Sequence, residues 1–492
     1  MKIYIFLLLL GGGFLSNLYA AQKPNIVFIL ADDLGYGEVG CFGQKKIKTP
    51  TIDRLAAHGM KLTQHYCGAP VCAPSRCVLL TGKNLAHAEI RNNRGARAKR
   101  NPSKGIFPGQ WPISAEAITI AEVLKKAGYA TGAFGKWGLG RNDSTGAPNK
   151  QGFDRFYGYI CQENAHSYYP PYLESDDKKV KINDPWVFGH QRKPKGEVRA
   201  EDYRAQNYSS DLILAEALKF IDKNKDKPFF LYVPFIEPHV ALQTPQKWID
   251  MYPKEWDPKP YRNAKGYGYT PHPRPNAAYA GLISHLDDHV RVILERLKKD
   301  GIDKNTIVIF TSDNGTTFGG IGGVDAKFFN SVQGLRGLKG TAYEGGIRVP
   351  CVVYWPGKIK PGSVSNVATY FPDWFPTLCS IAGAKVPEGL NDGVNLLPLL
   401  TGTGPLPKRK ELMIWEFYGH GGVTAIRKGK WKALKHGSIN SNKKWELYNI
   451  ETDRFEKHNV AAQHPEIVQE LEKAWRKTRT NPNARKRKKK RR

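Results

Sequence analysis

The sequence predicts an α/β fold: a large mixed, mostly parallel sheet flanked by helices, then a smaller C-terminal α+β domain containing an antiparallel sheet. Three observations lead to this prediction. Apolar runs typical of buried strands alternate with helical periodicity up to about residue 355. Polar residues follow directly after four of these runs. Beyond Pro405, short strand-like runs precede one amphipathic helix.

The first half of the chain shows the helix–strand alternation clearly. The run NIVFIL at residues 25–30 is short and rich in β-branched residues, so it predicts a buried strand. A helix begins at Thr49-Pro50 and stops at Gly59, since proline suits the first helical turn and glycine the end. Apolar spacing over residues 120–127 predicts another helix, which leads into a strand at 129–134.

The same alternation continues in the second half. A helix at residues 211–221 leads into the strand PFFLYV at 228–233. A long helix, with apolar residues spaced from 282 to 297, precedes the strand TIVIF at 306–310. Repeated helix–strand order is typical of a sheet covered by helices.

The C-terminal region has a different pattern of predicted elements: short strands in succession, followed by one helix. The runs at residues 412–418, 424–434 and 445–450 predict antiparallel strands, and residues 465–478 predict a closing amphipathic helix. We therefore divide the chain into a signal peptide at 1–21, a main domain at 22–404, a small α+β domain at 405–480 and a disordered basic tail at 481–492.

The N-terminus predicts export to the periplasm or the medium. Lys2 precedes an apolar run at residues 3–10, and Leu18-Tyr19-Ala20 offers a cleavage site. A membrane anchor is the alternative, but the apolar run is short and is interrupted by glycines, so we expect no stable membrane span.

The net charge indicates which partners the protein binds, and the cysteine count bears on disulfides. The formal net charge is +30, to which the tail RKRKKKRR contributes. A basic surface attracts polyanions, and for an exported protein an acidic polysaccharide is favoured over nucleic acid. The tail itself is either a solvated end or a binding segment. Seven cysteines, an odd number, indicate no disulfide framework.

Polar residues follow the four predicted strands of the main domain. In an open α/β sheet, ligands bind beyond the carboxyl ends of the strands. One Asp-Asp pair alone would suggest a turn, but two acidic or amide pairs at separate strand ends favour a hard cation, Ca²⁺ or Mg²⁺. The residues are Asp32, Asp33, Lys136, His239, Asp313 and Asn314.

The stretch VCAPSRCVLLTG places Cys72 and Cys77 five residues apart. Spacing alone leaves three possibilities open: a disulfide, a pair of metal ligands, or one nucleophile. Positive charge for an anionic substrate would come from four residues, Arg76, Lys136, His239 and Lys339.

The motif Cys72-Ala73-Pro74-Ser75-Arg76, followed by Leu80-Thr81-Gly82, resembles that of the formylglycine-dependent sulfatases (type I, Cys-type) of the alkaline phosphatase superfamily. The resemblance extends from about residue 23 to about residue 480. It implies an alkaline phosphatase-like fold, a catalytic sulfatase domain at 22–404 and hydrolysis of sulfate esters. Together with the export signal and the basic charge, it suggests a sulfated carbohydrate substrate.

The resemblance also implies the chemistry. A separate formylglycine-generating enzyme would oxidise Cys72 to Cα-formylglycine, so Cys72 is a precursor and Cys77 a bystander. The hydrated aldehyde would attack sulfur, and its second hydroxyl would then expel sulfate, a step that serine could not perform.

The resemblance assigns roles position by position. One Ca²⁺ ion, with Mg²⁺ less favoured, would be held by Asp32, Asp33, Asp313, Asn314 and residue 72. Arg76 and Lys136 would hold the nucleophile. His239 and Lys339 would bind the sulfate, and His239 would protonate the leaving oxygen.

One departure concerns Gly138, where many relatives carry histidine. His166 and His87 are candidates to replace it or to contact substrate, and ordinary loop histidines are the alternative. Two other functions stay open: a phosphoester or phosphonate hydrolase of the same superfamily, and an inactive polyanion-binding homologue.

Overall fold

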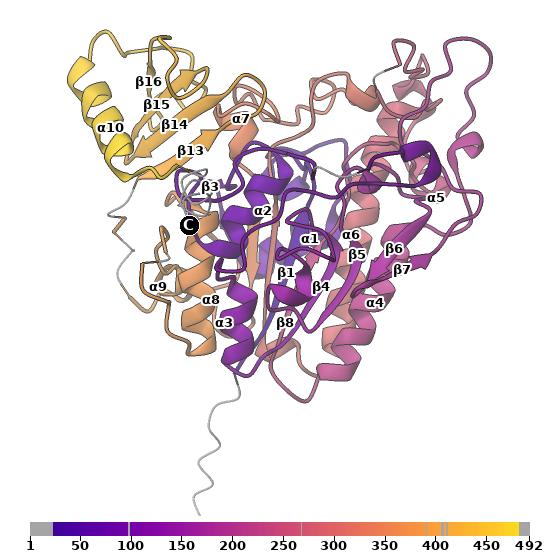
Figure 1. The fold of residues 1–492 in the computed structure, drawn as a ribbon, viewed down its shortest axis with the longest axis horizontal. Coiled ribbons are helices and arrows are strands. Elements are labelled where there is room, and N and C mark those ends of the chain that lie inside the picture. The colour runs from indigo at the N-terminus through magenta and orange to yellow at the C-terminus, as the bar shows by residue number, and fades with distance from the viewer. Residues whose placement is uncertain are drawn as a thin grey trace, which may run out of the picture.

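A ten-stranded mixed sheet forms the centre of the molecule in this computed structural model (Figure 1). The structure describes residues 23–96, 99–266, 268–389, 391–404, 408–409 and 412–481. The predicted signal peptide at 1–21, and the predicted basic tail from residue 482 onward, lie outside the described residues.

The inner strands of the sheet are parallel. In spatial order they are β9 (Thr306–Ser312), β1 (Asn25–Ala31), β8 (Phe229–Pro234), β4 (Ala130–Lys136) and β5 (Arg155–Tyr159). One flank continues through β10 (Cys351–Tyr354), β2 (Met60–Leu62) and β11 (Ser363–Ser365), with β10 antiparallel to both neighbours. The other flank adds antiparallel β6 (Tyr172–Ser175) and β7 (Lys178–Lys181). This confirms the predicted mixed, mostly parallel sheet.

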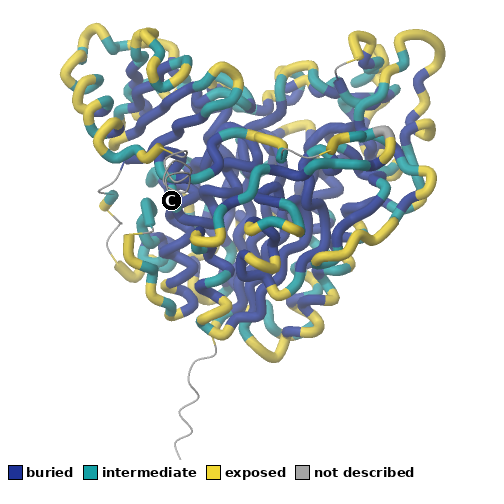
Figure 2. The backbone as a smooth tube through the Cα atoms, viewed as in Figure 1, coloured by how far each residue is buried: buried dark blue, intermediate teal, exposed yellow. Residues whose placement is uncertain are grey.

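Helices cover both faces of the sheet. One face carries α2 (Cys72–Thr81), α3 (Ile120–Lys126) and α8 (Trp374–Ala382), and the other carries α1 (Pro50–His58), α4 (Ser209–Asn224) and α6 (Pro275–Lys299). Strand β1 is apolar from Ile26 to Ala31 because both of its faces are covered. Ile26 and Phe28 pack in one core and Val27 and Ile29 in the other, so every side chain is buried (Figure 2).

The remaining main-domain elements are short. They are the strand pair β3 (His65–Tyr66) and β12 (Thr369–Tyr370) and the helices α5 (Gln246–Ile249), α7 (Glu344–Ile347) and α9 (Leu397–Thr401). No helix among the described residues combines the length and apolar character that crossing a membrane requires.

A four-stranded antiparallel sheet follows, made of β13 (Met413–Phe417), β14 (Val423–Lys428), β15 (Trp431–His436) and β16 (Glu446–Asn449). The predicted run 424–434 thus forms two strands, which separate at Gly429, a residue with φ of 57°. Helix α10 (Pro465–Thr478) packs on this sheet through Leu471 and Trp475.

The small sheet is anchored to the main core. Trp415 lies in the same apolar cluster as β1, and its indole N–H donates to the carbonyl of Cys67 at 2.9 Å. The buried Lys432 ammonium lies 2.9 Å from carboxylate oxygens of both Glu344 and Glu456. The boundary at residue 405 therefore stays a prediction, because the packing is continuous across it.

Candidate active site

The site lies where the inner strands end. Parallel strands present their carboxyl ends at one edge of a sheet, so residues far apart in sequence meet there. Asp32 and Asp33 follow β1, Lys136 ends β4, His239 follows β8, Asp313 and Asn314 follow β9, and Cys72 begins α2. All seven are buried.

The acidic residues form a compact group of oxygen donors. The Asn314 amide nitrogen donates to Asp33 Oδ1 at 2.7 Å, and the Asp33 backbone N–H donates to Asp313 Oδ1 at 3.2 Å. Asp33 has φ of 68°, a left-handed conformation that aspartate tolerates better than most residues. Asp33 is thus linked by hydrogen bonds to both Asp313 and Asn314, and one ligand atom each from Asp32, Asp33, Cys72 and His239 lies within 4.8 Å of the others.

This donor set fits a hard dication. Asn314 Oδ1 is buried and has no hydrogen-bond partner among the described residues. Burial and the neighbouring Asp32 carboxylate raise the pKa of Asp313 to about 7. Burial also opposes ionisation of Asp32, but Lys136, His239 and Arg76 outweigh it and hold the pKa of Asp32 far below its usual range. A Ca²⁺ ion would satisfy the free amide oxygen and relieve the repulsion between the carboxylates.

Cys72 lies at the first position of α2 and is 1% exposed. Its thiol donates to Asp32 Oδ1 at 3.3 Å, and its sulfur lies 3.7 Å from Lys136 Nζ and 3.6 Å from Lys339 Nζ. Burial and Asp32 together raise the pKa of the Cys72 thiol well above its ordinary value. Because a reactive cysteine needs a thiolate, this environment disfavours a working thiol. All seven cysteines are free, so no disulfide occupies Cys72.

Three cations neutralise the carboxylates. Arg76, one helical turn after Cys72, donates from Nε and Nη2 to Asp313 Oδ2 at 3.0 and 2.7 Å. Lys136 Nζ lies 2.5 Å from Asp32 Oδ2. Lys339 Nζ lies 2.7 Å from Asp33 Oδ2. The structure thus brings these residues together as the sequence predicts, and their individual roles stay predictions.

His239 faces the same group from the loop after β8. Its Nδ1 bonds the carbonyl of Val240, which leaves Nε2 3.6 Å from Asp33 Oδ2. Burial lowers the pKa of His239 to about 4, although Asp33 opposes this. The ring is therefore uncharged at neutral pH until another anion arrives.

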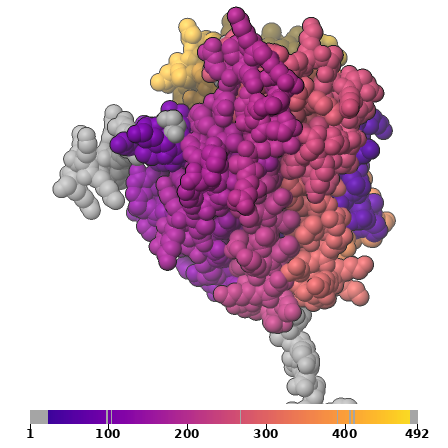
Figure 3. Space-filling view, turned by 90° about the vertical axis from the view of Figure 1, so that its right-hand side faces the viewer, coloured from indigo at the N-terminus to yellow at the C-terminus, as the bar shows by residue number. Residues whose placement is uncertain are grey.

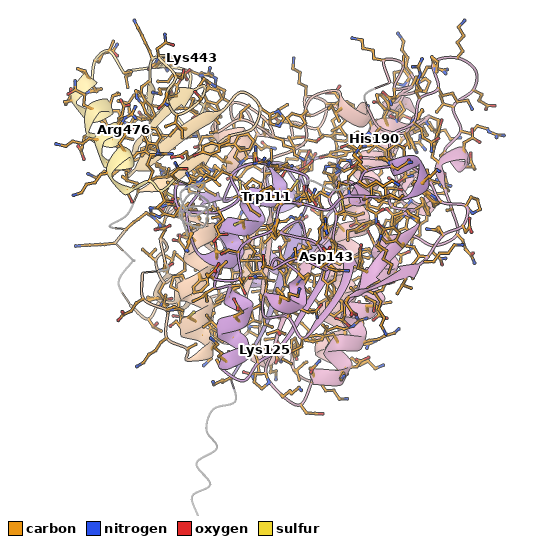
Figure 4. The ribbon with its side chains drawn as sticks, in the orientation of Figure 1. Trp111, Lys125, Asp143, His190, Lys443 and Arg476 are labelled. Atoms are coloured by element: carbon orange, nitrogen blue, oxygen red, sulfur yellow. The ribbon has the colours of Figure 1, made fainter. Side chains whose placement is uncertain are left out.

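His166 stacks on His239, with ring centroids 5.2 Å apart and planes at 10°. His166 Nδ1 lies 2.9 Å from His190 Nε2, and Tyr269 packs edge-on against His166. In Figure 4, His190 and Trp111 lie in the upper half of the view, on the side of the strands' carboxyl ends. His166 is thus next to the site, and its role as a substrate contact stays a prediction.

The contacts of His87 favour the alternative of an ordinary loop histidine, and its role as a substrate contact stays a prediction. Both ring nitrogens are engaged in structural contacts: Nδ1 lies 2.8 Å from Asp392 Oδ2, and Nε2 lies 2.8 Å from the Thr478 carbonyl. His87 therefore ties the loop after α2 to the end of α10. The sequence around His87 could not indicate these contacts, because Asp392 and Thr478 are remote in sequence.

Sequence reasoning missed Gln162, which occupies the space beside Gly138. Gly138 has φ of 85°, and a Cβ there would collide with the Gln162 side-chain amide. The Gln162 amide nitrogen is buried and has no hydrogen-bond partner among the described residues. The Gln162 side chain therefore packs against Gly138, the position at which the sequence departs from the family motif. Only the departure at Gly138 hinted at such a partner.

We expect Gly138→Ala to destabilise the protein by about 2 kcal/mol or more, since it combines backbone strain with a steric clash. Gly128→Ala is a matched control, because Gly128 has φ of 90° but open space around it. Urea denaturation should show a larger loss of stability for Gly138→Ala than for Gly128→Ala. Adding Gln162→Ala to the Gly138→Ala variant should remove the difference, because the clash is relieved. Equal losses at both glycines would contradict the steric account.

A second missed residue comes from the C-terminal sheet. His420, in the turn between β13 and β14, packs against Phe318 at 5.2 Å, and Lys339 Nζ lies 5.8 Å from the same Phe318 ring. The small domain therefore contributes to the surroundings of Lys339. No motif marks His420, because the contact exists only after the two sheets have packed.

Known proteins are similar to this chain over most of its length. The sulfatase family model matches residues 24–384, and a model described as N-sulphoglucosamine sulphohydrolase, C-terminal, matches residues 338–481. Human arylsulfatase A is 32% identical, over 93% of this chain and 88% of that protein. N-acetylgalactosamine-6-O-sulfatase of Bacteroides thetaiotaomicron is 30% identical, over 92% of each.

Solved structures of similar sequence have the same fold. Ps i-CgsB in complex with k-i-k-neocarrahexaose is 31% identical and superposes with a TM-score of 0.71, covering 92% of this chain and 91% of that one. Fold, site geometry and sequence similarity over nearly the whole chain lead to one conclusion: this chain belongs to the sulfatase family and is a sulfuric ester hydrolase.

Proposed function

We propose that this chain is an exported sulfatase that removes sulfate from a carbohydrate, with a formylglycine made from Cys72 as its reactive residue. The observation that supports this most directly is the position of Cys72. Its buried thiol, held among carboxylates and lysines, lies where an attacking oxygen would meet an anionic ester. The Cys72 sulfur stands in for the oxygens of the hydrated aldehyde.

The cations around position 72 suit binding and orientation. Lys136 and Lys339 approach the sulfur from two directions, so they can hold the charge of the nucleophile and of a sulfate group. Arg76 orients Asp313 and also donates to the Lys136 carbonyl, which links α2 to the end of β4. When bound to Asp32, Asp33, Asp313 and Asn314, Ca²⁺ supplies further positive charge for the developing anion.

His239 is placed to move a proton. Its Nδ1 is engaged by the Val240 carbonyl, so Nε2 faces the reacting groups. Burial lowers the pKa of the His239 ring, and an incoming sulfate would favour the protonated ring. His239 could then give that proton to the leaving oxygen, so that the product departs as an alcohol and not as an alkoxide.

The proposals of a carbohydrate substrate and of export rest on observations other than the geometry of the site. The relative from Bacteroides is named for an amino-sugar sulfate, and Ps i-CgsB holds a carbohydrate. This chain has a net charge of +30, which favours a polyanionic substrate. The histidine and tyrosine rings around His166 offer surfaces on which a sugar could stack. The N-terminal 21 residues read as an export signal.

The test is to co-express the full chain with a formylglycine-generating enzyme and compare an aryl sulfate with the matching aryl phosphate. We expect the sulfate to be cleaved faster, and the peptide spanning residue 72 to have the mass of formylglycine. Unmodified Cys72 in fully active enzyme would refute the mechanism. Faster cleavage of phosphate would favour the phosphoester hydrolase. Release of sulfate from sulfated oligosaccharides would then define the substrate class.

A further inference from the structure

We propose that Asp211, His285 and His289 form a second metal site, suited to a transition-metal dication such as Zn²⁺, with Glu237 as the carboxylate behind the two histidines. The site lies between α4 and α6, on the face of the sheet that these helices cover. Figure 3 shows the side of the molecule to which α4 contributes (magenta to pink). The proposal does not depend on the sulfatase reaction.

The three ligand side chains already converge. His285 and His289 are four residues apart on α6, so they project from the same helical face. Their Nε2 atoms lie 3.0 and 3.1 Å from the same oxygen, Asp211 Oδ1, at the start of α4. One ligand atom from each residue lies within 4.8 Å of the others. With bonds of 2.0–2.2 Å, a tetrahedral metal separates its ligands by roughly 3.3–3.6 Å, a few tenths of an ångström more than the two Nε2–Oδ1 distances.

The opposite edges of both rings face one buried carboxylate. His285 Nδ1 and His289 Nδ1 each lie 3.9 Å from Glu237 Oε1, and the Glu237 side chain is fully buried. Neither Nδ1 atom and neither Glu237 oxygen makes a hydrogen bond of ordinary geometry among the described residues, although the Ser210 hydroxyl lies close enough to interact with Glu237. Four buried polar atoms without such bonds at one place are costly, because each has lost water without full replacement.

Counting protons shows what would satisfy these atoms. A neutral imidazole carries one N–H, so a ring that donates from Nε2 to Asp211 presents an acceptor from Nδ1 to Glu237. Protonating both rings would satisfy both edges but would place two cations side by side, since the ring centroids are 4.1 Å apart. Burial opposes this, because two neighbouring charges would be held away from water.

A metal ion resolves the conflict. If both Nε2 lone pairs bind the metal, each Nδ1 carries the proton and can donate toward Glu237 after a small shift. This is the arrangement in which a carboxylate fixes the tautomer of a metal-bound histidine. Two imidazoles and one carboxylate suit zinc or a similar ion, whereas the oxygen-rich group around Asp32 suits calcium.

The surroundings hold the site in shape and keep it reachable. Trp248 stacks on His285 at 5.3 Å and 27°, and Phe235 stacks on His289 at 5.1 Å and 30°. Both rings are therefore fixed in orientation. The Asp211 side chain is 57% exposed, so a metal can enter from solvent and keep a position for water. Glu237 lies two residues before His239, so metal binding would stabilise the loop that carries His239.

The experiment measures Zn²⁺ binding by the full chain, purified without a polyhistidine tag, stripped with a chelator and kept in excess Ca²⁺. Competition with a chromogenic chelator should show one Zn²⁺ equivalent for the wild type. His289→Gln and Asp211→Asn should each lose it. Glu237→Gln should retain stoichiometry with roughly 10- to 100-fold weaker affinity. Co²⁺ in place of Zn²⁺ should give the visible absorption of a four-coordinate site in the wild type, and this absorption should be lost in His289→Gln and Asp211→Asn.

His458→Gln is the matched control, because His458 is 80% exposed and lies 3.7 Å from Asp453. It should leave binding unchanged. Circular dichroism of each variant shows whether it is folded, so lost binding can be separated from lost structure. No Zn²⁺ equivalent in the wild type, or an equal loss in His289→Gln and His458→Gln, would overturn the proposal.

Discussion

Replacing Cys72 with serine is expected to lower turnover of an aryl sulfate by on the order of 10⁴-fold or more, as when other enzymes lose their nucleophile. Serine offers one hydroxyl and could accept the sulfuryl group, but it has no second hydroxyl with which to expel it. The variant should therefore perform at most one turnover. Steady-state kinetics with the chromogenic ester, together with the mass of the peptide spanning residue 72, measure both effects.

Cys77→Ser is the control for Cys72→Ser. Cys77 lies on the same helix and is 1% exposed, as is Cys72. Its substitution should reduce stability modestly and leave kcat within a few-fold of the wild type. Full activity in Cys72→Ser would exclude the formylglycine route. Equal loss of activity in both variants would mean that the helix, not the residue at 72, is what the substitutions disturb.

Replacing Arg76 with methionine is expected to lower the free energy of unfolding by about 3–5 kcal/mol, the usual cost of removing one partner from a buried ion pair. Arg76 is fully buried and donates two hydrogen bonds to Asp313 Oδ2. Methionine has a similar length but no charge, so Asp313 would remain ionised without that partner or would take up a proton. Urea denaturation in Ca²⁺ measures the loss.

Arg141→Met tests whether any arginine–aspartate pair would behave in this way. Arg141 pairs with Asp143 at the surface, where the Asp143 side chain is 66% exposed. Exposed pairs contribute little, so its loss should change stability by less than about 1 kcal/mol. A loss at Arg76 no larger than that at Arg141 would show that the buried pair is not needed for the fold.

Local patterns in the sequence were enough to predict the strands and helices that build the site. The run 26–30 is apolar throughout because β1 is covered on both faces. The helix at 465–478 matches α10, whose apolar stripe meets the small sheet. Asp32, Asp33, Asp313 and Asn314 could be grouped because they follow strands, and parallel strands end at one edge.

Contacts between remote segments could not be predicted in this way. His87 was predicted to lie near substrate, yet Asp392 and Thr478 hold both of its nitrogens. Gln162 lies beside Gly138 and His420 packs against Phe318, both from loops whose sequences carry no motif. Asp211 belongs to a different helix from His285 and His289, so their convergence follows from how α4 and α6 pack.

The sequence by itself determined the class of fold, the motif at Cys72 and the residue types that surround an anionic ester, because periodicity and strand ends are local properties. Only the tertiary structure decided which histidines lie together, what fills the space beside Gly138 and where buried polar atoms lack partners. Those features depend on distances between side chains that are far apart along the chain, and packing alone sets these distances.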